Sequence, residues 1–129
     1  MFTSDDVQAP LLFLDFDGVL SKGLTGDFRH RNLLEAWLRT VQDIRLVITS
    51  SWRLERSLED VQLHFSRDIR SRVVDATPHL PSERLQRQAE ILTWREQVGH
   101  EGPFAALDDS IEQFEIAWPF VVLTTRHGL

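Results

Sequence analysis

The sequence predicts an α/β fold, a three-layer α/β/α sandwich around a mostly parallel five-stranded sheet. Short apolar runs alternate with segments of helical periodicity along the whole chain. The apolar runs are continuous, which is typical of parallel strands that are buried on both faces. No repeat, low-complexity tract or linker interrupts the 129 residues. We therefore expect a single domain over residues 1–129.

The first half of the chain is expected to form two strands and two helices. Leu11 to Phe16 is an apolar run that ends in acids and glycine, which indicates a buried strand leading into a loop. Apolar residues recur at helical spacing between Asn32 and Val41. Ile44 to Ile48 predicts the second strand. The next helical stripe comprises Leu54, Leu58, Val61 and Phe65.

The second half is expected to supply three further strands and two helices. Ser82 is a suitable N-cap for a helix that runs to Val98, and Gly99 stands where helices commonly end. A shorter helix is marked by Ile111, Phe114 and Trp118. The predicted strands are Val73–Val74, Phe104–Leu107 and Phe120–Leu123. Three tryptophans fall on apolar helix faces and are expected in the core: Trp37, Trp94 and Trp118.

Composition excludes several classes of protein. Because the chain has no cysteine, it forms no disulfide and has no thiolate nucleophile or cysteine-bound zinc. No apolar run approaches the ~20 residues that span a bilayer, and the acidic N-terminus is unlike a secretory signal. The net charge of −6 argues against a protein that coats nucleic acid. The five histidines share no short ligand spacing. We expect a cytoplasmic protein with no membrane contact and no obligate protein partner.

Polar side chains follow three of the predicted strands. Because ligands of parallel sheets bind outside the carboxyl ends of the strands, these residues are expected to converge at one edge. A group of close carboxylates suits a divalent cation with oxygen ligands, Mg²⁺ above all. The alternative is that strand-end acids only cap helices and solvate loops. The polar pairs are Asp15 and Asp17, Thr49 and Ser50, and Asp108 and Asp109.

The same segments resemble the motifs of the haloacid-dehalogenase-like (HAD) phosphohydrolases. LLFLDFDGVL is similar to the first motif, LVITSSWR to the second and FAALDDS to the fourth, so the resemblance covers Leu11 to Leu123. It implies a Rossmann-like sheet with strands in the order 5-4-1-2-3. The connections after the first and third strands are too short for a cap domain. The family's third motif is a lysine before the fourth strand, but Ser82 to Val98 contains none, so arginine must serve.

A closer resemblance is to the small HAD-like domains associated with RNA-repair proteins. These domains show a similar SSWR after the second strand and a basic residue ahead of an E-I-x-x-W helix. They also carry a DD motif and a GL near the end. The matching residues here are Ser50 to Arg53, Arg87 ahead of Glu90, Ile91 and Trp94, then Asp108, Asp109, Gly128 and Leu129.

The resemblance implies a role for each site residue. Asp15 would be the nucleophile and Asp17 the general acid and base. The metal ligands would be Asp15, Asp17, Asp108 and Asp109. The hydroxyl that binds phosphate would come from Ser50, with Thr49 as the alternative. Arg87, or else Arg84, would replace the lysine, and Arg53 would add a phosphate contact.

The activity implied is a Mg²⁺-dependent phosphomonoesterase that works through an aspartyl-phosphate. An open site suits large phosphorylated substrates such as RNA or DNA ends. The basic loop from Ser21 to Arg31 is a candidate contact for them, although a merely solvated loop is the favoured interpretation. One alternative is a catalytically inactive HAD-like binding module, because arginine replaces the lysine. A receiver-type phosphoacceptor domain is less favoured, because no lysine follows Lys22.

Overall fold

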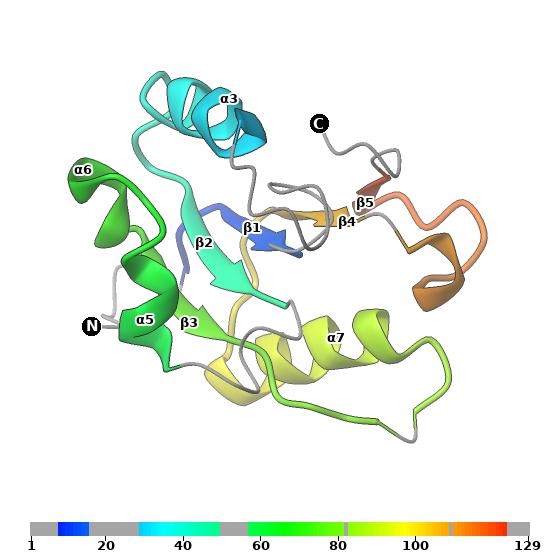
Figure 1. Ribbon diagram of the computed structural model, residues 1–129. Helices are drawn as coiled ribbons and strands as arrows, with labels where there is room; N and C mark the ends of the chain where they lie inside the picture. Colours follow the sequence, from blue (N-terminus) through cyan, green and yellow to red (C-terminus); the bar gives the residue numbers. More distant parts are fainter. Residues whose placement is uncertain (1–7, 16–28, 50–56, 82, 109, 124–129) are drawn as a thin grey trace.

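Five strands form one all-parallel sheet in the order β3-β2-β1-β4-β5 (Figure 1). The computed structural model describes residues 8–15, 29–49, 57–81, 83–108 and 110–123. The strands are β1 (Leu11–Leu14), β2 (Arg45–Ile48), β3 (Val73–Ala76), β4 (Phe104–Asp108) and β5 (Val121–Leu123). The predicted α/β sandwich and its strand order are confirmed.

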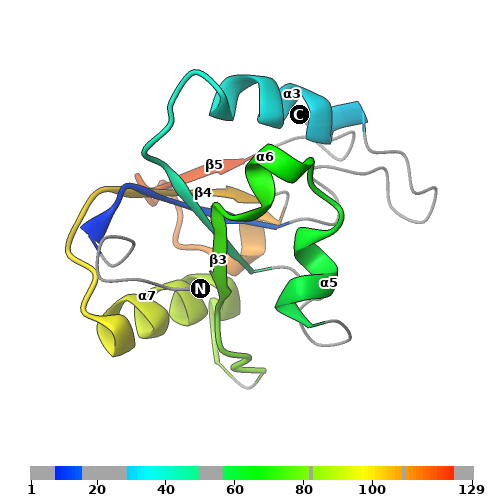
Figure 2. The same cartoon turned by 90° about the vertical axis from the view of Figure 1, so that its left-hand side faces the viewer.

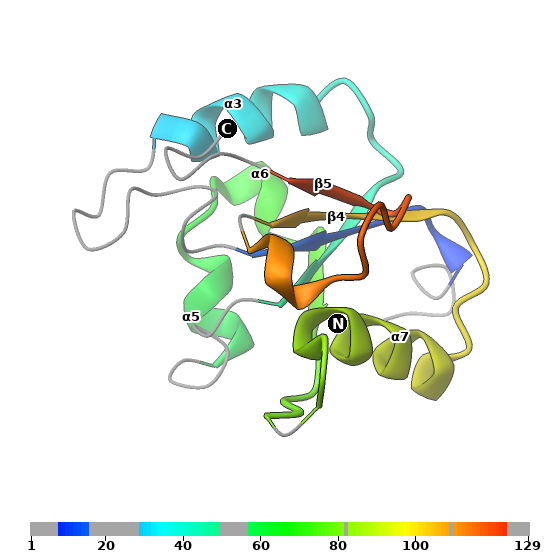
Figure 3. The same cartoon turned by 90° about the vertical axis from the view of Figure 1, so that its right-hand side faces the viewer.

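Helices cover both faces of this sheet, which makes three layers. One face carries α3 (Arg29–Leu38), α5 (Leu58–Gln62) and α6 (Arg67–Arg70); the other carries α7 (Gln86–Val98) and the 3-10 helix η2 (Ile111–Gln113). Figures 2 and 3 show α3 and α7 on opposite sides of the sheet. No cap domain occurs within the described ranges, and no helix in them is long and apolar enough to cross a membrane.

Alternation along the strands fills two separate cores. In β1, Leu12 and Leu14 pack toward α3, whereas Leu11 and Phe13 pack toward α7. Phe13 meets Trp94 of α7 edge to face, with ring centroids 5.6 Å apart. Both faces of β1 are therefore buried, which explains why the strand reads as a continuous apolar run.

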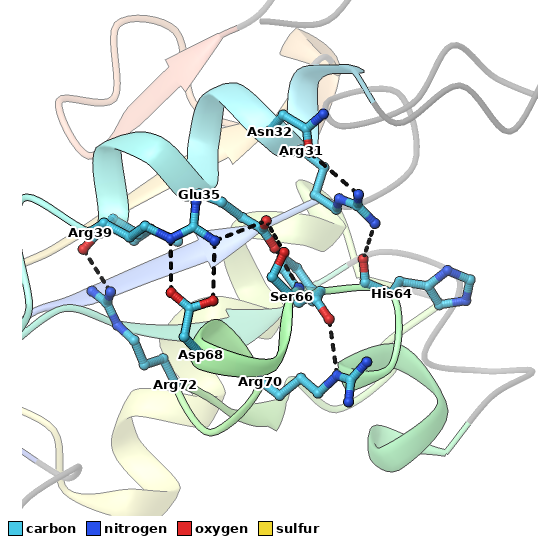
Figure 4. A network of polar contacts seen from close by, with 11 residues as sticks. Arg31, Asn32, Glu35, Arg39, His64, Ser66, Asp68, Arg70 and Arg72 are labelled. Carbon is cyan, nitrogen blue, oxygen red and sulfur yellow. Dashed lines mark hydrogen bonds and ion pairs between the residues drawn. The ribbon is translucent and has the colours of Figure 1, made fainter.

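A network of polar contacts joins α3 to α6 (Figure 4). Glu35 is buried in the middle of α3, with 1% of its surface exposed. Its Oε2 accepts a hydrogen bond from the backbone N–H of Ser66 at 2.7 Å, and its Oε1 accepts one from the Ser66 hydroxyl at 2.6 Å. Ser66 is the N-cap of α6. Glu35 therefore satisfies a helix end that the Ser66 side chain itself does not cap.

Arg72, just before β3, holds the connection from α3 to β2. Its guanidinium donates to the carbonyl oxygens of Leu38 and Val41, both at 2.6 Å, and of Ile44 at 3.1 Å. Burial, with a smaller contribution from the charge of Arg45, lowers the pKa of Arg72. The side chain still carries its charge at neutral pH, so these hydrogen bonds are charge-assisted.

All four predicted helices differ from those observed. The helix expected between Asn32 and Val41 is α3, which begins and ends three residues earlier, at Arg29 and Leu38. The stripe from Leu54 to Phe65 gives the short helix α5, followed by α6; Leu54 lies outside the described residues. Helix α7 begins only at Gln86, after Leu85 in a left-handed conformation (φ 53°), and Ser82 also lies outside the described residues. It ends at Val98, with Gly99 (φ 76°) as its C-cap, as predicted. The helix expected between Ile111 and Trp118 shrinks to η2.

The prediction that all three tryptophans are core residues was partly wrong. Trp94 is buried, but Trp37 is 46% exposed, and Trp118 is half-buried in a turn outside any helix. Trp37 lines an open apolar cavity of about 440 Å³ between α3 and the strands β4 and β5. Helical periodicity indicates which face of α3 is apolar. How much of that face is buried depends on the elements that pack against it. The lining residues are Leu12, Leu33, Leu34, Trp37, Ala105, Leu107 and Val122.

Candidate active site

Three polar residues stand side by side where β1, β2 and β4 end. The backbone N–H of Asp15 donates to the carbonyl of Leu107, and that of Thr49 donates to the carbonyl of Leu14, both at 3.0 Å. Asp108 is the last residue of β4. The exposed fractions of Asp15, Thr49 and Asp108 are 6%, 1% and 1%. The parallel register therefore brings the three predicted residues together at the carboxyl edge of the sheet.

Strand alternation assigns these residues to the face that α7 covers. Phe13, Val47 and Ala106, each two positions earlier on its strand, all belong to the core beneath α7. Because side chains two apart share a face of a strand, Asp15, Thr49 and Asp108 fall on that same face.

Thr77, which is not among the predicted site residues, extends this row of strand ends. Its backbone N–H donates to the carbonyl of Ile48 at 3.0 Å, and the residue is buried with 5% exposed. Its position directly after the third strand is the sequence signal that could have included it.

Arg87 of α7 reaches the row of strand ends. Its Nε lies 3.2 Å from Oδ2 of Asp108, with the two side chains 16% and 1% exposed. Arg84 is exposed in the turn before the helix. Of the two arginines considered as substitutes for the lysine, the structure thus brings Arg87 to the site.

A cation in the first turn of a helix is opposed by the helix dipole, so Arg87 needs neighbours that hold it there. Its backbone N–H donates to Oε1 of Gln113 at 3.2 Å. The next residue, Gln88, exchanges two hydrogen bonds with Glu115, at 2.8 and 3.0 Å. These contacts fix the first turn of α7 against the segment that follows β4, and so fix Arg87 relative to Asp108.

Glu90 is a second carboxylate beside Arg87, which the sequence analysis quoted only as part of a motif. It is fully buried, and its Oε1 lies 3.9 Å from Nη1 of Arg87. Its Oε2 accepts hydrogen bonds from the backbone N–H of Leu80 at 2.9 Å and from Nε2 of Gln86 at 3.0 Å. The signal available was its place three residues after Arg87, on the same helix face.

The donor chemistry of the site fits a hard divalent cation. Asp15 and Asp108 supply carboxylate oxygens on adjacent strands, and oxygen is the donor that Mg²⁺ prefers. The other two predicted ligands, Asp17 and Asp109, lie outside the described residues. Within the described residues, no three His, Asp or Glu side chains are grouped so as to hold a metal ion.

Several other predicted contacts also fall outside the described part of the chain. These are Ser50, Arg53 and most of the basic loop. The last residues of the predicted loop lie in α3 instead: Arg31 is half-buried there, and its Nη1 donates to the carbonyl of His64 at 2.8 Å. This arginine packs against the segment between α5 and α6.

Comparison with known proteins identifies a family to which the chain is similar. No curated protein and no solved structure matches the chain. The family model described as the HAD domain in Swiss Army Knife RNA repair proteins matches residues 11–129. This match covers all five strands and every described residue of the site. The chain therefore belongs to the family of HAD domains found in Swiss Army Knife RNA repair proteins.

Proposed function

We propose that this protein is a Mg²⁺-dependent phosphomonoesterase. The observation that carries the proposal is the placement of Arg87 against Asp108, one strand away from Asp15. A nucleophilic carboxylate, a metal-binding carboxylate and a phosphate-binding cation are the groups that phosphoryl transfer requires. The match to a HAD family supports the same chemistry.

The proposed reaction consists of two successive displacements at phosphorus. A carboxylate oxygen of Asp15 attacks phosphorus, the phosphorus–oxygen ester bond breaks, and Asp17 gives a proton to the departing oxygen. A water molecule then attacks the phosphorus of the aspartyl-phosphate, Asp17 takes a proton from it, and the bond between phosphorus and the Asp15 oxygen breaks. This step releases inorganic phosphate and restores Asp15. Bound Mg²⁺ supplies positive charge that offsets the negative charge of the phosphoryl group.

Two further residues bind the phosphoryl oxygens in this proposal. Arg87 offers guanidinium N–H donors in a planar fork that suits phosphate. Thr49 is favoured over Ser50 as the hydroxyl donor, because alternation assigns Thr49 to the face that carries Asp15 and Asp108.

The substrate class proposed is a phosphorylated RNA or DNA end. The family description names RNA repair proteins, and no cap domain occurs within the described residues to close over a small substrate. A polynucleotide end can enter such an open site without a closing step.

The test is hydrolysis of an aryl phosphate with Mg²⁺, repeated with EDTA and with Asp15→Asn. We expect turnover that EDTA abolishes and that Asp15→Asn lowers by at least ~10²-fold. RNA and DNA oligonucleotides with 3′-phosphates, compared with 5′-phosphates, then define the substrate. Turnover that persists in Asp15→Asn would contradict the proposed nucleophile.

A second candidate function is a binding module without catalysis, which the replacement of lysine by Arg87 favours. A guanidinium is bulkier than an ammonium and binds phosphate with two donors. If 3′-phosphorylated oligonucleotides bind in the presence of Mg²⁺ but are not hydrolysed, this second function replaces the first.

A further inference from the structure

We infer that Glu90 is a positioning residue, which holds the Arg87 guanidinium between two buried carboxylates and so aims it at the phosphoryl group. The inference rests on the proposed function for its consequence in catalysis. Its structural part, the hold of Glu90 on Arg87, can be tested on its own.

The buried position of Glu90 carries a cost in free energy. Its side chain has no exposed surface, and a carboxylate removed from water is stable only beside compensating charge and hydrogen bonds. Arg87 is the arginine within ion-pair distance of it in the described part of the chain. His79 also approaches its Oε2, at 3.5 Å, with a side chain that is 40% exposed.

Two hydrogen bonds hold the Glu90 carboxylate in place. Its Oε2 accepts them from the backbone N–H of Leu80 and from the side-chain amide of Gln86. The other oxygen, Oε1, lies 3.9 Å from Nη1 of Arg87, within ion-pair distance but beyond that of a hydrogen bond. A fixed carboxylate restrains a long flexible side chain, because it favours one of many rotamers of the arginine.

Two carboxylates lie near two different nitrogen atoms of the Arg87 guanidinium. Nε lies 3.2 Å from Oδ2 of Asp108 and Nη1 lies 3.9 Å from Oε1 of Glu90; both are ion-pair contacts and neither is a hydrogen bond. When Asp108 takes part in metal binding, its hold on the guanidinium weakens. Glu90 then keeps Arg87 in place, and the remaining N–H groups of the fork are available to phosphate.

The test uses Glu90→Gln, with Glu96→Gln as the matched control on the exposed side of the same helix. Glutamine keeps an acceptor for the Leu80 N–H but removes the charge that faces Arg87. We expect KM for the aryl phosphate to rise by about 10-fold or more in Glu90→Gln, the scale found when an outer-shell partner is lost. The control should be unchanged, and Glu90→Asp, which retains the charge, should restore part of the loss.

Thermal unfolding separates positioning from stability. Removing one partner of a buried ion pair is destabilising, so the Tm of each variant is measured beside its KM. Positioning predicts that Glu90→Gln loses substrate affinity at temperatures well below its own Tm. A fall in affinity that merely follows a fall in Tm in both Glu90 variants would overturn the inference.

A spectroscopic measurement tests the hold without any turnover. The ¹H–¹⁵N signal of the Arg87 Nη1 group, which is the group nearest Glu90 and is assigned by its loss in Arg87→Lys, reports how well Glu90 fixes the guanidinium. We expect its exchange with solvent to be faster in Glu90→Gln and unchanged in Glu96→Gln. An unchanged signal in Glu90→Gln overturns the inference. If the wild-type protein hydrolyses no phosphate ester, the proposed function fails, while this measurement still decides the role of Glu90.

Discussion

Replacing Arg72 by methionine should lower the stability of the fold by about 3 kcal/mol. Methionine keeps an apolar stem in the buried position but removes the donors to Leu38, Val41 and Ile44. Each of these three carbonyls retains one other donor: Val41 N–H, Ile44 N–H and Arg45 Nη1 respectively. None is left without a hydrogen bond. A bond to a charged donor is worth about 1.5–3 kcal/mol, but the variant is also relieved of the desolvation of the buried guanidinium, which leaves a loss of about 1 kcal/mol for each bond removed.

The assay is urea unfolding followed by circular dichroism. With a denaturant slope of about 2 kcal/mol per molar urea, a loss of 3 kcal/mol lowers the midpoint by about 1.5 M. The control is Arg84→Met, because Arg84 is exposed in the turn before α7. A midpoint for Arg72→Met within about 0.3 M of the control would refute the reasoning that these charge-assisted bonds hold α3 to β2 and β3.

Three further predictions concern other parts of the molecule. Glu35→Gln weakens the cap of α6 and should cost about 1–2 kcal/mol in the same urea assay. Burial, followed by the charge of Arg95, lowers the pKa of His100 although the carbonyl of Ala9 opposes the shift. The contribution of His100 to the free energy of unfolding is therefore fully present above the unfolded-state pKa of about 6.5. It is lost as the pH falls below that value, at a rate of at most about 1.4 kcal/mol per pH unit for one group. Arg87→Met should lower kcat/KM for the aryl phosphate by about 10²-fold or more, with Arg87→Lys intermediate.

Each of these predictions has a contradicting result. An unfolding midpoint of Glu35→Gln equal to that of wild type would deny the cap a role in stability. The pH dependence below about 6.5 should flatten in His100→Gln, and a variant that keeps the wild-type slope would place its origin in other groups. If Arg87→Met retains the wild-type kcat/KM, the cation at Asp108 does not contact the phosphoryl group.

The fold and the strand-end residues were predictable because they depend on local patterns. A strand buried on both faces must be apolar throughout, so β1 and β2 could be read directly from the chain. Polar residues directly after such strands, among them Asp15, Thr49 and Asp108, must meet at one edge once the strands are parallel. This much follows from the order of residues.

The limits of α3 and α7 depended on contacts that no local pattern encodes. The apolar stripe of α3 is real, yet Trp37 stays 46% exposed because it borders the open cavity between α3 and the strands β4 and β5. Helix α7 starts late because Leu85 adopts a left-handed conformation and Gln113, from a distant segment, receives the Arg87 N–H.

The sequence by itself determined the alternation of strands and helices, the buried strands and the polar residues at their ends. The tertiary structure alone decided that Arg87 rather than Arg84 meets Asp108 and that Glu90 is buried behind it. The physical reason is the separation along the chain of the residues that interact. Periodicity and strand-end position depend on neighbouring residues, whereas the charges that surround a buried side chain come from segments brought together only by folding.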